Sequence, residues 1–426
     1  MRKFAFLVIA MMLVAIPVLA QADTDGRRPD LGISYGDHPA DRGDDRGGEE
    51  MPSYWEEYYV QDLEIGPFMG RLHDVLTDPE MLGHFPEVAT VADYLDTIGF
   101  FNLDRCHTEY EITGEDITYT ASSFYSDLDP ECYYGQMLAL EDKELVSARY
   151  VPGSQMLYIG INNVPETLMI ELKSMKDATS FVEELTAEMG VDADMNMDDM
   201  DEVFALLDAF PVEQTVNALL TGELALVLYN LPPFEQLVLG DIEPADIEAA
   251  VMLGVRDREA VMDMVTGFGA EIGLLEREYE GDDWQYFVIN GEETIGAIFN
   301  DDLAVVTSNL DVTRANMKAA LAEGGMDLDP CQMYFDMNIE AVQEQLIGPA
   351  GRMAAAQLGE DVELPFEGMG YLVNLPGSDA LGHLTLMTSY DDGYTVDIEM
   401  KKAVFQYLVY YGGLAACGLA QSGVFD

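Results

Sequence analysis

Four oxygen-bearing side chains at alternating positions could bind a calcium ion. They lie in VDADMNMDDMDEV, residues 191–203, and are Asp192, Asp194, Asn196 and Asp198. Carboxylate and amide oxygens are the ligands that calcium prefers, and these positions match one, three, five and seven of an EF-hand loop. Position six is Met197 where the loop needs glycine, and position twelve is Val203 where it needs glutamate. We therefore favour a helix N-cap at this segment, with calcium as the alternative cofactor.

The sequence contains none of the common catalytic or nucleotide-binding motifs that were considered. The sequence contains no G-x-S-x-G, H-E-x-x-H, G-x-x-x-x-G-K-[ST] or G-x-G-x-x-G pattern. A carboxylate pair of the kind that glycosidases use cannot be singled out among 80 acidic residues. We predict no catalytic or cofactor-binding residue, and the sequence favours a non-enzymatic protein over an enzyme.

Four cysteines could form two disulfides in an oxidising compartment: Cys106, Cys132, Cys331 and Cys417. Three connectivities are open. We favour Cys106 with Cys132 and Cys331 with Cys417, because each pair stays within one end of the chain. Metal binding by these thiols is the less favoured interpretation, because no C-x-x-C spacing occurs.

The N-terminus indicates export. Arg2 and Lys3 precede an apolar run, and small residues follow at Ala20 and Ala22. This order is typical of a secretory signal peptide, so residues 1–22 are expected to be removed and the protein to be periplasmic or secreted. Residues 23–52 are rich in Gly, Asp and Arg and predict a flexible acidic leader.

The charge excludes some partners. The formal net charge is −60, and a polyanionic backbone would be repelled, so nucleic-acid binding is not expected. The chain is nevertheless 49% hydrophobic, which predicts a folded core under an acidic surface. Self-repulsion predicts that stability rises with salt.

Alternating helical and strand patterns predict an α+β fold. Helical periodicity is clear at residues 86–100, 176–190, 200–210 and 258–268. Hairpin turns are predicted at residues 114–116, 281–283, 300–302 and 391–393, where Gly, Asn and Asp tolerate positive φ. We expect antiparallel sheet built from hairpins, with helices packed on one face.

Short sequence matches indicate an internal duplication. PGSQMLYIGIN, residues 152–162, matches PCQMYFDMN at 330–338, and ALVLYNLPP at 225–233 matches MGYLVNLPG at 369–377. A further match aligns residues 168–185 with 249–265 and predicts a strand that ends at a helix-capping Asp in each. We therefore divide the mature chain into an N-terminal helical and hairpin region, 53–147, a first α+β repeat, 148–325, and a second, shorter repeat, 326–426.

The segments ARYVPGSQMLYIGIN, LTGELALVLYN and VMLGVRDREAV also carry a family resemblance. Over about residues 145–345 the chain resembles an uncharacterised family of exported bacterial proteins, the domain-of-unknown-function 3352 type. The resemblance implies an exported α+β repeat protein and brings no active-site residues.

The C-terminal run from residue 403 to 425 carries no charge and is long enough to span a bilayer. A span would leave Lys401 and Lys402 outside, against the positive-inside tendency. We favour a buried terminal helix and expect no stable membrane span after signal removal.

Three functions follow in order of preference. The first is an exported, non-enzymatic α+β scaffold or binding protein whose partner is an unknown protein or small molecule. The second is an extracytoplasmic hydrolase that uses carboxylates, and the third is a low-affinity calcium-binding surface module. A pair of carboxylates with a raised pKa would favour the hydrolase. Several oxygen ligands that converge on one point would favour the calcium module.

Overall fold

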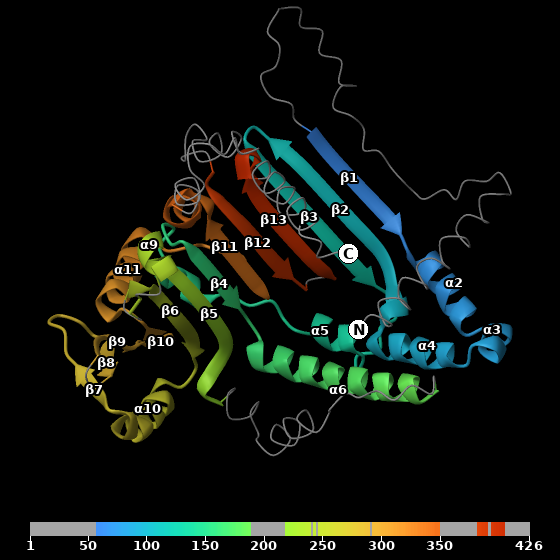
Figure 1. Cartoon of the computed structure of the whole chain (residues 1–426), viewed down its shortest axis with the longest axis horizontal. Helices are drawn as coiled ribbons and strands as arrows, with labels where there is room; N and C mark the ends of the chain where they lie inside the picture. Colours follow the sequence, from blue (N-terminus) through green and yellow to red (C-terminus); the bar gives the residue numbers. More distant parts are fainter. Residues whose placement is uncertain are drawn as a thin grey trace, which may run out of the picture.

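The computed structural model describes residues 57–188, 218–239, 242–243, 246–289, 292–349, 381–390 and 393–404. The expected signal peptide and leader, the candidate calcium ligands Asp192, Asp194, Asn196 and Asp198, the helix at 200–210 and Cys417 lie outside these residues. Within them the protein has an α+β fold, as predicted, built on one large antiparallel sheet (Figure 1).

The first part of the chain contains three strands and a group of short helices. Its elements are β1 (Glu57–Glu64), α2 (Gly66–Leu76), α3 (Pro79–His84), α4 (Glu87–Ile98), the 3-10 turn η3 (Phe100–Asn102), β2 (Leu103–Thr113), β3 (Asp116–Tyr125), α5 (Tyr133–Leu138) and the 3-10 turn η4 (Val146–Tyr150). The predicted helix at 86–100 is α4. It ends at Gly99, whose φ of +82° is a left-handed conformation that costs glycine little.

The middle part follows with β4 (Leu157–Ile161), α6 (Val164–Glu188), β5 (Leu220–Asn230), α9 (Phe234–Leu239), β6 (Glu248–Val255) and α10 (Arg258–Ile272). Then come β7 (Leu274–Arg277), β8 (Gln285–Ile289), β9 (Glu292–Phe299), β10 (Leu303–Thr307) and α11 (Leu310–Glu323). The last elements are β11 (Met333–Asn338), α12 (Ile339–Val342), the π-helical turn η6 (Gln343–Ile347), β12 (His383–Ser389) and β13 (Tyr394–Lys401).

One sheet contains all thirteen described strands. Their order is β1-β2-β3-β13-β12-β11-β4-β5-β6-β10-β9-β8-β7. The hairpins predicted at 114–116, 281–283 and 300–302 join β2 to β3, β7 to β8 and β9 to β10. The strands β12 and β13 that flank the predicted turn at 391–393 also pair, although residues 391 and 392 are not described.

The strands that the sequence matches relate, β4 and β11, are neighbours in the sheet. The backbone N–H of Asn162 donates to the carbonyl of Gln332 (2.7 Å), and that of Asn338 donates to Met156 (3.0 Å). These two bonds join β4 and β11 at the two ends of their pairing. The match at 369–377 lies outside the described residues; β12 takes the place beside β11 that β5 takes beside β4.

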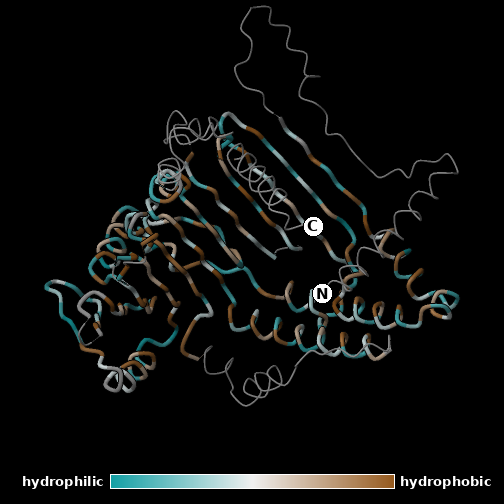
Figure 2. Tube along the Cα trace, in the orientation of Figure 1, coloured by the Kyte–Doolittle hydropathy of each residue, from teal (hydrophilic) through white to brown (hydrophobic). Residues whose placement is uncertain are grey.

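One side of the sheet carries an uninterrupted apolar row. Directly paired residues of an antiparallel sheet point to the same face, so the row can be followed across eight strands. It consists of Tyr119, Ile398, Leu386, Phe335, Ile159, Leu226, Val251 and Val306. We call this side the apolar sheet face. Figure 2 shows the alternation along the strands as changing colour.

Helices cover both faces of the sheet, whereas the sequence predicts helices on one face only. On the apolar sheet face, Val261 of α10 packs with Val255 and Ala304. On the opposite face, Leu310 and Met317 of α11 join the largest core cluster. Strands β6, β8 and β9 have apolar side chains on both sides, so each side needs its own cover.

Helix α6 corrects a second expectation. Residues 168–176, predicted as a strand before a capping Asp177, belong instead to this single helix. Leu168, Met169 and Leu172 are good helix formers, and nothing between them and Asp177 breaks the helix. The matching strand-to-helix junction at Asp257 is as predicted, since its side chain caps α10 by accepting from the Ala260 N–H (3.0 Å).

The favoured disulfide between Cys106 and Cys132 is absent from the described residues, and the favoured partner of Cys331, Cys417, lies outside them. Cys106 and Cys132 are both free thiols. Cys106 lies on β2 with its Sγ 4.0 Å from the Ser123 hydroxyl, whereas the Cys132 Sγ accepts from the Gly135 N–H (3.2 Å) at the start of α5. Cys331 is a free, fully buried thiol, and burial raises its pKa to about 12.

Candidate functional site

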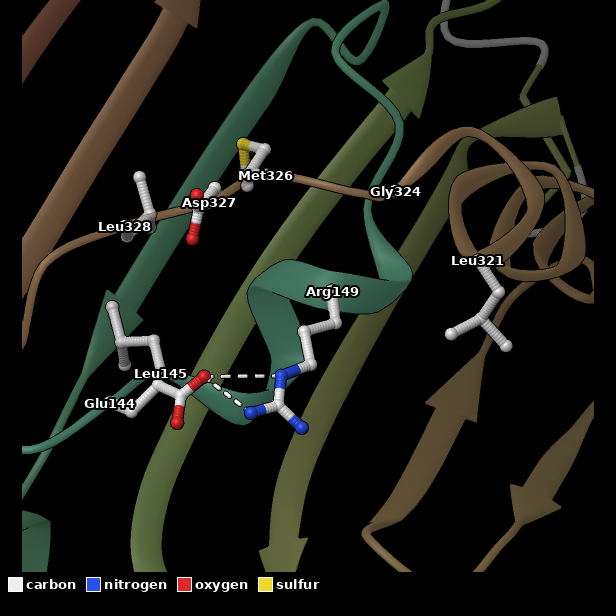
Figure 3. Close-up of a pocket in the computed structure, with 8 residues that line it drawn as sticks. All are labelled: Glu144, Leu145, Arg149, Leu321, Gly324, Met326, Asp327 and Leu328. Carbon is white, nitrogen blue, oxygen red and sulfur yellow. Dashed lines mark hydrogen bonds and ion pairs between the residues drawn. The ribbon is translucent and has the colours of Figure 1, made fainter.

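A cavity of about 460 Å³ opens beside η4, on the face of the sheet opposite the apolar sheet face (Figure 3). It lies between η4 and the loop that follows α11. Its lining combines two acids, one arginine and four apolar side chains: Glu144, Asp327, Arg149, Leu145, Leu321, Met326 and Leu328, with Gly324 completing the wall.

The charged part of the cavity is the pair Arg149 and Glu144. The Arg149 Nε and Nη2 both donate to the same oxygen, Glu144 Oε1, at 3.1 and 2.5 Å (Figure 3). The hydrogen bond to Glu144 raises the pKa of Arg149 above its ordinary value. Both side chains are about half exposed. An ion pair this exposed adds little to folding stability, so its groups can exchange partners with a bound molecule.

The apolar part of the cavity continues into the protein core. Leu145 is 1% exposed and belongs to the largest core cluster, against which Met326 and Leu328 also pack. Leu321, on α11, is 46% exposed at the opening. A molecule in the cavity would therefore meet charge near the entrance and a fixed apolar wall behind it.

A buried carboxylate holds the turn η4 in place. The Glu223 side chain on β5 accepts the backbone N–H groups of Val146 (3.0 Å) and Ser147 (2.8 Å). Burial raises the pKa of Glu223 above its ordinary value, against the opposing effect of these hydrogen bonds. Because each carboxylate oxygen already accepts an N–H, Glu223 positions the residues that precede Arg149.

A buried polar chain lies behind Met326. The Gln155 Nε2 donates to Asp336 Oδ2 (2.7 Å) and contacts the Met326 Sδ (3.6 Å). Asp336 Oδ1 in turn lies 2.6 Å from the His383 Nδ1. Among the described residues, Gln155 Oε1 has no hydrogen-bond partner. This chain ties the cavity wall to β11 and β12.

A cation–aromatic cluster adjoins the cavity. We define it as Asp282, Trp284, Tyr279, Tyr286, Arg314 and Lys318. Asp282, which the sequence predicts only as a turn residue, is 3% exposed and accepts from Arg314 Nε (2.8 Å), Lys318 Nζ and the Tyr286 hydroxyl. Burial would raise the pKa of Asp282, but these hydrogen bonds outweigh it and hold the pKa well below its usual range.

Aromatic contacts connect the cluster to the cavity. The Arg314 guanidinium lies 4.1 Å from the Tyr279 ring centre, and the Lys318 ammonium 5.3 Å from that of Trp284. Trp284 meets the Tyr150 ring edge-on, with ring centres 6.1 Å apart. Tyr150 follows Arg149 in η4, so Trp284 is a natural reporter of changes at the cavity.

No site predicted from the sequence is brought together within the residues that the structure describes. The four candidate calcium ligands and Cys417 are outside the described residues, and Cys106, Cys132 and Cys331 are separate thiols. Within the described ranges, no group of three or more His, Cys, Asp or Glu side chains could hold a metal ion. No described helix is long and apolar enough to cross a membrane.

The sequence pattern did not predict the residues that line the cavity. One signal was available for Glu223, which is an acid at an inward position of the alternating strand LTGELALVLYN. Arg149 gave no signal, because its role depends on the loop after α11. Comparisons with protein-family models, curated proteins and solved structures found no match to this chain.

Proposed function

We propose that this chain is an exported, non-enzymatic binding protein and that the cavity beside η4 holds a small molecule. The observation that carries the proposal is the cavity itself. Its volume of about 460 Å³ falls within the range of about 300 to 1,000 Å³ in which ligand pockets lie. Its mixed lining suits a ligand held by both charge and apolar contact.

The lining favours a zwitterion with an aliphatic part. Arg149 would bind a carboxylate, for which its guanidinium is shaped. Glu144, released from Arg149, and Asp327 would attract an ammonium group, whereas a simple anion would be repelled by them. Leu145, Met326 and Leu328 would cover the aliphatic part. An aliphatic amino acid or its dipeptide combines these three features.

Two observations weigh against the other functions. Glu223, the described carboxylate with a raised pKa, has both oxygens occupied by backbone N–H groups, which suits positioning better than acid catalysis. One of the acidic turn residues has a structural role, because Asp282 forms ion pairs with Arg314 and Lys318. Calcium binding at residues 192–198 remains the alternative cofactor proposal.

Export belongs to the same proposal. The signal-like residues 1–22, the acidic leader and the resemblance of residues 145–345 to exported proteins support a periplasmic or secreted location. The net charge of −60 suits a soluble surface that does not bind nucleic acid. Disulfide formation there is proposed only for pairings other than Cys106 with Cys132.

Fluorescence titration tests the binding site. Trp55→Phe leaves Trp284 as the single tryptophan of the chain. Leucine or Leu-Leu should change its fluorescence saturably, whereas octanoate and octylamine, which carry one charge each, should bind at least about ten-fold more weakly. Arg149→Gln should weaken leucine or Leu-Leu binding by about ten-fold or more, since a charged hydrogen-bonding partner is lost.

The matched control is Arg258→Gln. Arg258 also pairs with one acid, Asp301, but it lies at the start of α10 on the other face of the sheet. Equal binding by the Arg149 and Arg258 variants would place the site elsewhere. No saturable response to any of the four probes would reject the proposed ligand class.

A further inference from the structure

Lys143 places its ammonium group against a side-chain amide instead of a carboxylate. Its Nζ donates to the Oδ1 of Asn163. No ion pair within the described part of the chain includes Lys143. Lys318, by contrast, donates to the carboxylate of Asp282. The difference matters chemically, because an ionised carboxylate resists attack by an amine, whereas the carbon of a carboxamide is an electrophile.

Hydrogen bonds hold the carboxamide of Asn163 in one orientation. The residue is 2% exposed, and its Nδ2 donates to the Glu141 carbonyl (2.9 Å) and to Gln332 Oε1 (2.8 Å). Both amide hydrogens are therefore used, and Oδ1 faces Lys143. Because Oδ1 is bonded to Cγ, the amine lies beside the carbon that it would attack.

The backbone of Lys143 is fixed as well. Its N–H donates to the Cys331 carbonyl (3.4 Å), and the Cys331 N–H donates back to the Lys143 carbonyl (3.0 Å). The same carbonyl accepts from the Nδ2 of Asn162 (2.8 Å), the residue next to Asn163. Both reacting side chains thus start from anchored positions, which lowers the entropic cost of bringing them together.

We propose that Lys143 and Asn163 form an intramolecular isopeptide bond. Nζ forms a bond to Cγ of Asn163, the Cγ–Nδ2 bond breaks, and Nδ2 leaves as an ammonium ion that takes both protons that Nζ gives up. An ammonium group and a carboxamide thus become an amide and an ammonium ion, so the step needs no oxidant, reductant or cofactor. The bond links residues 20 positions apart, and η4 lies within the loop that it closes.

Glu166 is the carboxylate that the structure places beside Asn163. A Cβ on Gly222 would lie 3.6 Å from Glu166 Oε2 and 3.7 Å from the Cα of Asn163, so the two residues flank the same glycine. Since glycine has no side chain, none from Gly222 separates them. A carboxylate in this place can take a proton from the attacking amine and give it to the leaving nitrogen.

Mass spectrometry of the full chain tests the bond. Glutamine has almost the mass of lysine, so Lys143→Gln should be heavier than the unmodified protein by about 17 Da, the mass of the ammonia that the bond releases. Lys401→Gln is the matched control, because Lys401 donates to the carboxylate of Asp116, and it should have the mass of the unmodified protein. Equal masses for Lys143→Gln and the unmodified protein would overturn the proposal.

This comparison also separates the bond from other losses of ammonia. Cyclisation of an N-terminal glutamine, or of an asparagine to a succinimide, would leave Lys143→Gln as light as the unmodified protein. Digestion of the unmodified protein after its glutamates gives a reading without any substitution, since the peptide 145–166 should carry the dipeptide 142–143 as a branch. Recovery of these two peptides only as separate species would overturn the proposal.

Glu166→Gln tests the transfer of the protons. Most of this variant should keep the ammonia, because an amide side chain cannot take up a proton from the amine. Glu183→Gln, at an exposed position of the same helix α6, should lose ammonia as the unmodified protein does. A circular dichroism spectrum like that of the unmodified protein shows folding. Complete linkage in Glu166→Gln would overturn the role assigned to Glu166.

Discussion

Single buried polar side chains determine where the cavity lies. Glu223 fixes η4 from β5, and Gln155 links Met326 to Asp336 from the start of β4. Each joins segments that are far apart in the sequence, and Gln155 and Asp336 are separated by 181 positions. Removing one partner from such a contact leaves a buried polar group unsatisfied, which is why these residues matter more than the exposed Arg149–Glu144 pair for the shape of the site.

His383 predicts a specific pH dependence. Its hydrogen bond to Asp336 raises its pKa above the ordinary 6.5, with Glu340 adding to the effect and burial opposing it. A raised pKa in the folded state means that the stabilising contribution is complete below pH 6.5 and is lost as the pH rises through the folded value. The unmodified protein should therefore have a higher unfolding free energy than His383→Gln, and this difference should be larger near pH 6 than near pH 9.

Urea unfolding at a series of pH values measures this difference. His84→Gln, at an exposed histidine of α3, controls for the replacement of one histidine by glutamine. A constant difference across the pH range would mean that the ion pair with Asp336 does not favour the protonated imidazole.

The roles of single residues were the hardest feature to predict from the sequence. An acid and a base a few positions apart, such as Glu144 and Arg149, are not distinctive in a chain with 80 acids, so the sequence does not single out this pair. Asp282 looked like any other turn residue, yet its burial among Arg314, Lys318 and Tyr286 makes it the centre of a cluster. Such roles depend on which strands become neighbours, and the sequence pattern does not determine that.

Elements were predicted best where one local signal set both their type and their boundary. The turns at 114–116 and 300–302 lie at the predicted positions because Gly114, with φ of +61°, and the Asn300 side chain favour tight reversals. Helix α6 was misjudged because residues 168–176 are apolar at short intervals that suit a strand as well as a helix. Only the structure shows that these residues belong to one helix of 25 residues.

The cap of α10 provides a prediction at this scale. Asp257→Ala removes the acceptor of the Ala260 N–H and should lower the unfolding free energy by about 1 kcal/mol, the usual contribution of such a cap. Asp263→Ala, at an exposed position within the same helix, should change it by less than about 0.5 kcal/mol. Denaturant midpoints compare the two. Equal effects would indicate that the change in charge, rather than the cap, determines the loss.

The whole molecule combines a large sheet with a strongly negative surface. The formal net charge of −60 predicts self-repulsion in the folded state, where the charges are closest. Raising sodium chloride from about 0.1 to 1 M should increase the melting temperature by several degrees, because the Debye length falls from about 10 to 3 Å. The same titration near pH 4, where many carboxylates are protonated, should give a smaller rise. A melting temperature that falls or stays constant with salt at neutral pH would contradict the prediction.

The sequence predicted the α+β class but not the continuity of the sheet. The three expected regions, 53–147, 148–325 and 326–426, all contribute strands to it, and β3 of the first pairs with β13 of the last. Hairpins can be predicted one at a time because their partners are adjacent in sequence. The pairing of β3 with β13 has no local signal, since it depends on matching apolar faces across most of the chain.

That pairing also determines when the protein can finish folding. Thr120 of β3 contacts Asp397 of β13, which lies 277 residues later in the chain. The β1–β2–β3 segment must therefore wait until β13 has been synthesised before β3 gains this partner. Long-range pairings of this kind form slowly. If the protein is exported as proposed, this delay is an advantage, because β3 stays without its partner until β13 has been made.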